Sequence, residues 1–182
     1  MLEAGLTNDD QATRWYAFSA ITYLNRPEIA DIILRGLEND YHGIRYTAVS
    51  AARSLAEHPD LRDRCVEGLK KILRKERENW NTSISAAWAL ADLGLPVPGR
   101  IFAEALKKDR LDHRLCARAL GILKCREAMQ LLIDRFECAD TWNSHEFNEA
   151  LKAITGQKLG RHPGPWREWL ESNRAYLPVQ WT

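Results

Sequence analysis

The chain has 182 residues, of which 45% are apolar and 28% charged, and its formal net charge is +1. This length suits one well-buried domain or one continuous array of repeats, and the composition argues against a wholly disordered chain. The near-zero net charge argues against a protein devoted to nucleic-acid phosphates, because such proteins usually carry a strong excess of Lys and Arg.

A helical stripe of small and large residues recurs along the chain. Its first copy is Arg14, Ala17, Ala20, Leu24, with two steps of three residues and one of four. Such steps place side chains on one helix face, and small residues in the middle of that face let a neighbouring helix approach closely. Later copies occupy 45–55, 83–93, 113–123 and 144–154. Their closing residues follow one another at intervals of 31, 38, 30 and 31 residues, which predicts a repeated unit.

A second apolar helix is predicted between successive copies, and prolines stand at the starts of the first three of these helices. The unit is therefore a helical hairpin of about 30 residues, which buries its apolar faces only when hairpins stack. Apolar and polar residues do not alternate with a period of two residues, so the sequence predicts no strand. We expect an all-α array with a half repeat at 1–9 and repeats near 10–39, 40–77, 78–108, 109–138 and 139–154.

Two departures from this repeat are visible. Residues 2–9 echo residues 34–40, with Gly5-Leu6 matching Gly36-Leu37. The chain is therefore expected to start on the tail of a second helix, either as a natural half-repeat cap or because a longer protein was trimmed. The interval of 38 residues contains an insertion at 71–81, which requires a lengthened second helix or an extended loop.

Two Asp–Arg pairs precede the first two stripes. Asp9 stands five positions before Arg14, and Asp40 five positions before Arg45. In this respect the chain resembles the HEAT-repeat family, particularly its short-period bacterial branch. The resemblance implies a right-handed α-solenoid (a superhelix) of about five HEAT-like hairpins, in which these four residues form a ladder of hydrogen bonds between adjacent repeats. The later copies have Ser or His in place of the arginine, so the ladder is not carried to them.

The segment 155–182 is predicted to cap the array. Its Thr155-Gly156 and Trp166-x-x-Trp169 look like an end segment of some bacterial HEAT-repeat proteins. Gly156 suits a helix C-cap, and Gly160 to Pro165 is expected to break the chain before a short helix that starts at Pro165. Its tryptophans would cover the open apolar side of the last repeat; the alternative is an aromatic ligand pocket.

Motifs for catalysis or for a metal are lacking in the sequence. His145-Glu146-x-x-Glu149 approaches a zinc motif, but its second histidine is replaced and no third ligand is evident. Cys116 and His113 lie three residues apart, but Cys116 occupies an inward position of its stripe, where a thiol is inert. We therefore expect no catalytic residue, no metal and no cofactor.

Basic residues crowd the insertion, with Lys70 and Arg74 among them and Trp80 close by. Interleaved glutamates favour a solvated helix face, with a protein contact or a single-stranded nucleic acid as alternatives. In HEAT solenoids the second helices line the concave surface, whose polar positions here carry both signs of charge. That mixture suits a protein partner better than a polyanion. The predicted binding residues are Trp80, as an anchor, with Arg35, Lys70, Arg74, Lys107 and Lys108.

The expected function is therefore a non-catalytic protein–protein interaction or scaffold module, monomeric or weakly self-associating, with a protein partner. One alternative is a HEAT-like enzyme or enzyme subunit of the bilin lyase or alkylbase DNA glycosylase type. Another is a fragment of a larger scaffold. The four cysteines match no zinc module and are expected to be reduced. With no signal peptide or membrane span expected, the predicted location is the cytoplasm.

Overall fold

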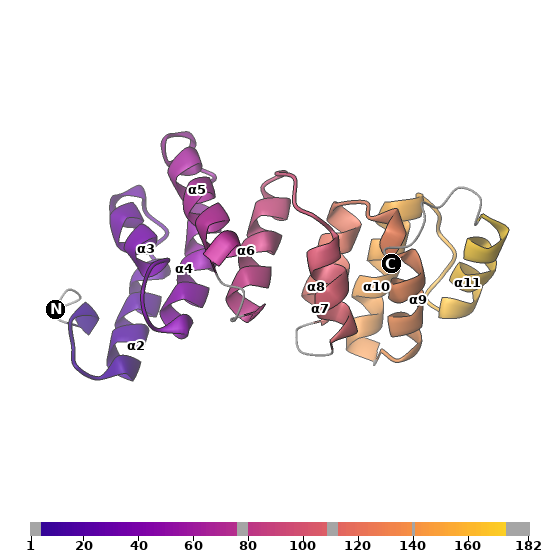
Figure 1. Ribbon diagram of the computed structural model, residues 1–182, viewed down its shortest axis with the longest axis horizontal. Helices are drawn as coiled ribbons and strands as arrows, with labels where there is room; N and C mark the ends of the chain where they lie inside the picture. The colour runs from indigo at the N-terminus through magenta and orange to yellow at the C-terminus, as the bar shows by residue number, and fades with distance from the viewer. Residues whose placement is uncertain (1–4, 76–79, 109–112, 140, 174–182) are drawn as a thin grey trace. The chain divides into compact units, whose positions relative to one another are not determined.

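The computed structural model describes residues 5–75, 80–108, 113–139 and 141–173. Within these ranges the chain forms ten α-helices with defined bounds, two short 3₁₀ turns and no strand (Figure 1). The all-α prediction is thus confirmed. The chain divides into two compact units, Met1–Leu95 and Pro96–Thr182, so the range 78–108, predicted as one repeat, contributes to both.

The first unit consists of alternating first and second helices of hairpins. Helix α4 lies against α2 and α6, which are also first helices, while the second helix α3 packs on α4, and α5 packs on α4 and α6 (Figure 1). A 3₁₀ turn, Pro27–Ile29, leads into α3. The bounds are α2 Gln11–Thr22, α3 Ala30–Gly36, α4 His42–Leu55, α5 Pro59–Lys75 and α6 Trp80–Asp92.

A close contact between glycine and alanine recurs in this unit. A Cβ added to Gly5 would lie 2.7 Å from the Cβ of Ala17, and one added to Gly36 would lie 3.1 Å from that of Ala48. The two contacts are related by the 31-residue interval of the stripes. The segments that echo each other in sequence therefore take equivalent places, each pressed against the next first helix.

The turns that precede α2 and α4 also match. Nη1 of Arg14 donates to the carbonyl oxygens of Asn8 and Asp9 at 2.6 and 2.9 Å. Nη1 of Arg45 donates to the equivalent carbonyls, those of Asn39 and Asp40, both at 2.7 Å. These bonds are local, because they join residues five or six positions apart, and they use the backbone of each aspartate and not its carboxylate. The ladder between adjacent repeats, which the family resemblance implies, stays a prediction.

The first stripe differs from the expected one. Ala20 is exposed and Leu24 is 49% exposed, whereas Phe18 and Ile21 are the buried residues of α2. Helix α2 ends at Thr22, so Leu24 lies beyond it, and among the described helices α2 has a first-helix neighbour, α4, on one side only. In the other copies the middle of the stripe is buried at Ala48, Ala86, Ala89, Cys116, Ala119, Phe147 and Ala150.

The insertion at 71–81 is accommodated largely by a longer second helix. Helix α5 has 17 residues and continues to Lys75, whereas the second helices α3, α7 and α9 have 7, 8 and 9. The next helix, α6, begins at Trp80. Residues 76–79 lie outside the described part of the chain.

The second unit repeats the same arrangement. Helix α8 packs between α7 and α10, and α9 packs against α10 and α11 (Figure 1). Gly121 allows the closest approach of α8 to α10, because a Cβ there would lie 2.9 Å from the Cα of Ala150. The bounds are α7 Arg100–Lys107, α8 His113–Ile122, α9 Met129–Glu137, α10 Thr141–Thr155 and α11 Pro163–Ser172.

One backbone motif ends a first helix in each unit. Gly94 and Lys124 have positive φ values of 76° and 48°. The amides of Leu95 and Cys125, which follow them, donate to carbonyls five residues back, both at 3.0 Å. This is the left-handed helix ending that favours glycine, and it recurs here at a 30-residue interval.

Candidate functional site

The predicted binding residues fall in both units. Arg35 lies on α3, and Lys70 and Arg74 lie on α5, all three exposed on neighbouring second helices of the first unit. Lys107 ends α7 in the second unit, and Lys108 follows it; both are exposed. Trp80 is the first residue of α6, but its side chain lies outside the described part of the structure, so its role as an anchor stays a prediction.

A groove of about 600 Å³ lies between α3 and α5, and we call it the α3/α5 groove. Its apolar floor consists of Leu34, Leu37, Gly68 and Ile72. A Cβ added to Gly68 would lie 2.6 Å from Cδ1 of Leu37, so the glycine lets α5 come close to α3 at this point. The polar lining consists of Glu38, Asn39, Asp40, Arg45, Arg64, Glu67 and Lys71.

The groove continues into a second, more open hollow of about 570 Å³ on the same two helices. Leu34, Glu38 and Arg64 line both, and Asp31 and Arg35 complete the second. The predicted Arg35 is therefore part of this surface. Because the two hollows share three residues, they form one continuous surface along α3 and α5.

Two ion pairs join α3 and the turn that follows it to α5 across this surface, and we call them the cross-helix ion pairs. Nη2 of Arg64 lies 2.6 Å from Oδ1 of Asp31, and Nζ of Lys71 pairs with Oε1 of Glu38. The four side chains are between 46% and 76% exposed. Since ion pairs in contact with water are screened, these contribute little to stability and stay accessible to a partner.

Other charged groups of the surface are engaged within their own helix. Nη2 of Arg74 lies 2.5 Å from Oε1 of Glu67 on α5, and Nε of Arg35 donates to the Asp31 carbonyl on α3 at 3.3 Å. The hydrogen bond and the charge of Arg74 lower the pKa of Glu67. In the same way Arg64 lowers the pKa of Asp31. Both carboxylates are therefore ionised at neutral pH.

Sequence reasoning missed the cross-helix ion pairs as a set. The signal was present, because acidic residues stand at position 31 of one second helix and at position 38 just after it, and basic residues stand at 64 and 71 of the next. Both pairs thus join residues 33 apart, close to the repeat interval. The predicted set named Lys70, which lies outside the groove lining, whereas its neighbour Lys71 belongs to the lining.

The buried cysteines are in poor positions for nucleophilic chemistry. Burial and the nearby Glu127 carboxylate raise the pKa of Cys125 to about 12, and burial raises the pKa of Cys65. Cys116 has no exposed surface. A thiolate, the reactive form, is therefore disfavoured at Cys65 and Cys125. Among the residues that the structure describes, no three His, Cys, Asp or Glu side chains gather as metal ligands would.

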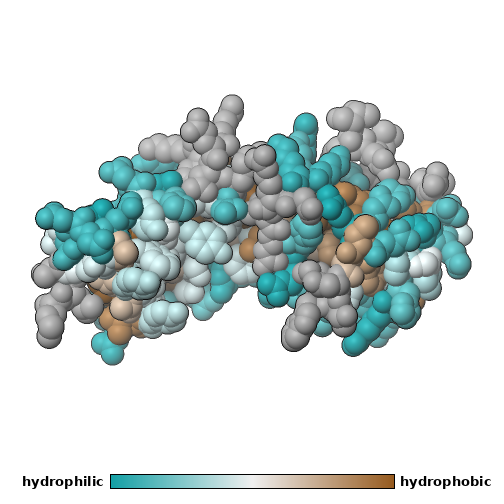
Figure 2. All heavy atoms as spheres, turned by 90° about the horizontal axis from the view of Figure 1, so that it is seen from below, coloured by the Kyte–Doolittle hydropathy of each residue, from teal (hydrophilic) through white to brown (hydrophobic). Residues whose placement is uncertain are grey.

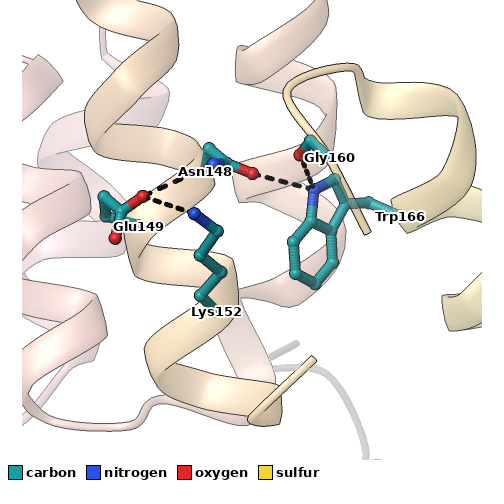
Figure 3. A network of polar contacts seen from close by, with 5 residues as sticks. All are labelled: Asn148, Glu149, Lys152, Gly160 and Trp166. Atoms are coloured by element: carbon teal, nitrogen blue, oxygen red, sulfur yellow. Dashed lines mark hydrogen bonds and ion pairs between the residues drawn. The ribbon is translucent and has the colours of Figure 1, made fainter. Parts of the chain in front are cut away.

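The carboxy-terminal segment holds a buried tryptophan (Figure 3). Trp166 has no exposed surface, and its Nε1 donates to Oδ1 of Asn148 at 3.3 Å and to the Gly160 carbonyl at 3.2 Å. Its ring is therefore enclosed within the second unit, bonded to α10 and to the segment before α11, instead of lining an open pocket. Helix α11 begins at Pro163, two residues before the expected Pro165, because Pro163 takes the first helical position after His162.

On the face shown in Figure 2, the described surface is a mixture of hydrophilic side chains and pale ones of intermediate hydropathy, and apolar side chains appear in smaller areas. Among the described residues, no helix combines the length and the apolar character that a bilayer crossing requires.

No known protein family matches the chain, and no curated protein is significantly similar to it. The α3/α5 groove is therefore the feature of the chain that indicates a function.

Proposed function

We propose that the chain is a non-catalytic protein-interaction module of the HEAT-repeat type, and that it binds a protein partner along the α3/α5 groove. The observation that carries this proposal is the groove itself: two consecutive second helices present an apolar floor between charged walls. Interfaces commonly combine an apolar centre with a polar rim, and this surface has both.

The proposal includes a right-handed solenoid of stacked hairpins. Its support is the recurrence of details at the repeat interval, since Gly5 and Gly36 press on equivalent alanines, and Arg14 and Arg45 bond to equivalent carbonyls. In such an array the second helices form a common surface, which diverges freely because stacking constrains only the interior.

Binding accounts for the groove better than catalysis does. General acid–base catalysis needs a group whose pKa lies near the working pH. Asp31 and Glu67 are instead held ionised, with pKa values below their usual range. Carboxylates of this kind suit charge pairing with a partner, and the apolar floor suits an anchoring side chain.

A photo-reactive amino acid placed at Arg35, beside the groove, tests the proposal. Its cross-linked partner, captured from lysate of the source organism, would be identified by mass spectrometry and purified. The matched control carries the photo-reactive group at Ser50, an exposed residue of α4 that does not line the groove. We expect a specific adduct from position 35 and none of the same protein from position 50.

The purified partner then allows the contributions of Lys71 and Lys70 to binding affinity to be compared. Lys71→Glu removes a cation from the groove and places a third carboxylate beside Glu38 and Glu67, so we expect binding to weaken by at least about tenfold. Lys70→Glu changes the net charge equally outside the groove lining, and its Kd should stay within about twofold. Titration calorimetry measures both values. Equal effects of the two substitutions, or a partner that cross-links equally at Ser50, would contradict the proposal.

A further inference from the structure

We infer that the partner segment is an amphipathic helix whose apolar stripe is flanked by basic side chains along one edge and by acidic side chains along the other. This inference rests on the proposed function and names the chemistry of its partner. Its basis is the separation of charge across the α3/α5 groove, the spacing of the cross-helix ion pairs and the position of the apolar floor.

Opposite charges stand on opposite walls of the groove. Helix α3 contributes the carboxylate of Asp31, the turn after it contributes that of Glu38, and α5 contributes the cations of Arg64 and Lys71. A partner that lies over the groove, along these ion pairs, therefore meets acidic groups on one side and basic groups on the other. Arg35 and Glu67 have the opposite sign on their walls and weaken this separation, but the other two charges on each wall outnumber them.

The cross-helix ion pairs can accept charged groups of a partner without being broken. An arginine has five N–H donors and a lysine three, while a carboxylate accepts up to about four hydrogen bonds. In the Arg64–Asp31 pair one nitrogen meets one oxygen, and the side chains of both pairs are substantially exposed. A partner carboxylate can therefore join Arg64 or Lys71, and a partner cation can join Asp31.

The spacing of these pairs favours a helix over an extended segment. On α5 the two cations, Arg64 and Lys71, stand seven positions apart, which corresponds to two helical turns and about 10 Å along the groove. In a partner helix, side chains at i and i+7 match this distance on one face. In an extended strand, side chains on one face repeat at about 6.6 Å and next at about 13 Å, and neither distance fits.

The apolar floor lies where the stripe of such a helix would fall. Leu34 is half-buried, lines both hollows and lies on α3 between Asp31 and the helix end that precedes Glu38. Leu37 and Ile72 continue the floor beneath the larger hollow. Apolar side chains on consecutive turns of a partner helix can fill these hollows while charged neighbours reach the walls, as in other helix-in-groove complexes.

Two stapled peptides of about four helical turns test the inference. Both carry the same leucine stripe and the same numbers of Lys and Glu. In the split peptide one edge is basic and the other acidic, whereas in the mixed peptide each edge carries one charge of either sign. The mixed peptide brings like charges together at half of the contacts, so we expect it to bind the full chain about tenfold more weakly in fluorescence anisotropy.

A chain variant should reverse this preference. Exchanging one cross-helix ion pair, with Glu38→Lys and Lys71→Glu together, preserves the pair and the net charge but places both signs on each wall. We expect this variant to bind the mixed peptide about tenfold more tightly than the split one, and both preferences should shrink in high salt. Unchanged far-ultraviolet circular dichroism verifies that the variant is folded.

Each failure has a distinct meaning. Equal affinities of the two peptides for the wild-type chain, or no binding of either at about 1 mM, would overturn the inference. A preference for the split peptide that persists in the exchanged variant would also overturn it. None of these results decides the proposed function, because the photo-cross-linking partner and the comparison of Lys71 with Lys70 test that separately.

Discussion

At the scale of single residues, Lys124 adopts a backbone conformation that costs conformational free energy, whereas Gly94 adopts the same conformation without this cost. Lys124 and Gly94 end equivalent helices with positive φ, yet only glycine adopts this conformation without a steric penalty. A Cβ added to Gly94 meets no atom within 4 Å, so a substitution there tests conformation without a clash. Introducing glycine at position 124 should therefore remove this cost, and replacing glycine at position 94 should introduce it.

We predict that Lys124→Gly stabilises the second unit by about 1 kcal/mol, whereas Gly94→Ala destabilises the first by about 1 kcal/mol. Lys124→Ala is the control, because alanine at positive φ bears about the same cost as lysine. Urea unfolding followed by circular dichroism measures these changes, and hydrogen exchange assigns them to a unit. A stabilising Gly94→Ala would show that the left-handed ending imposes no strain.

At the scale of helices, glycines set how closely one hairpin lies against the next. A Cβ at Gly36 would overlap the ring of Phe18 and crowd Ala48, both of which are buried on first helices. Phe18 thus occupies space that a side chain at position 36 would need. Packing of this kind is stringent because protein interiors leave few voids.

Gly36→Ala is predicted to destabilise the first unit by about 1–3 kcal/mol, since overpacking displaces Phe18 or separates α3 from α2 and α4. Gly164→Ala is the matched control in α11. Apart from its chain neighbours a Cβ there meets nothing within 4 Å, so the change should alter stability by no more than about 1 kcal/mol, because alanine has the higher helix propensity while Pro165 restricts the residue before it. Thermal unfolding by circular dichroism compares the two variants. Equal behaviour of both would contradict the role of Gly36 as a packing contact.

Helix positions were more predictable from the sequence than the groove was. Buried positions such as Ala48, Ala86 and Ala119 follow a 3.6-residue period, because packing demands it, so the helices could be placed. The first stripe shifted to Phe18 and Ile21, since α2 lacks a described first-helix neighbour on one side. Charges on a solvated face obey no such period. Their pairing depends on how neighbouring helices align, which the amino-acid sequence does not directly specify.

At the scale of the whole molecule, charged contacts are spread over both units. Several carboxylates have pKa values below their usual range, chiefly because a hydrogen bond from a cation or from Thr13 favours the ionised form; they are Asp10, Asp31, Glu67, Glu137 and Glu149. Three belong to the first unit and two to the second. Acid should therefore weaken both units.

The direction in which pH changes the free energy of unfolding follows from the difference in carboxyl pKa between the folded and the unfolded chain. A carboxyl with a lowered pKa in the folded chain takes up a proton more readily when unfolded, so its stabilisation is complete above about pH 5 and is lost as the pH falls through the folded pKa. Because these carboxylates are exposed, each contributes little, and we predict only a small, gradual fall in melting temperature between about pH 5 and pH 3. The fall should be smaller in 1 M NaCl, because four of the five carboxylates are held by ion pairs that salt screens. Hydrogen exchange at each pH should show loss of protection in both units. A melting temperature that stays constant to pH 3 would mean that these contacts persist in the unfolded chain or contribute nothing to the folded one.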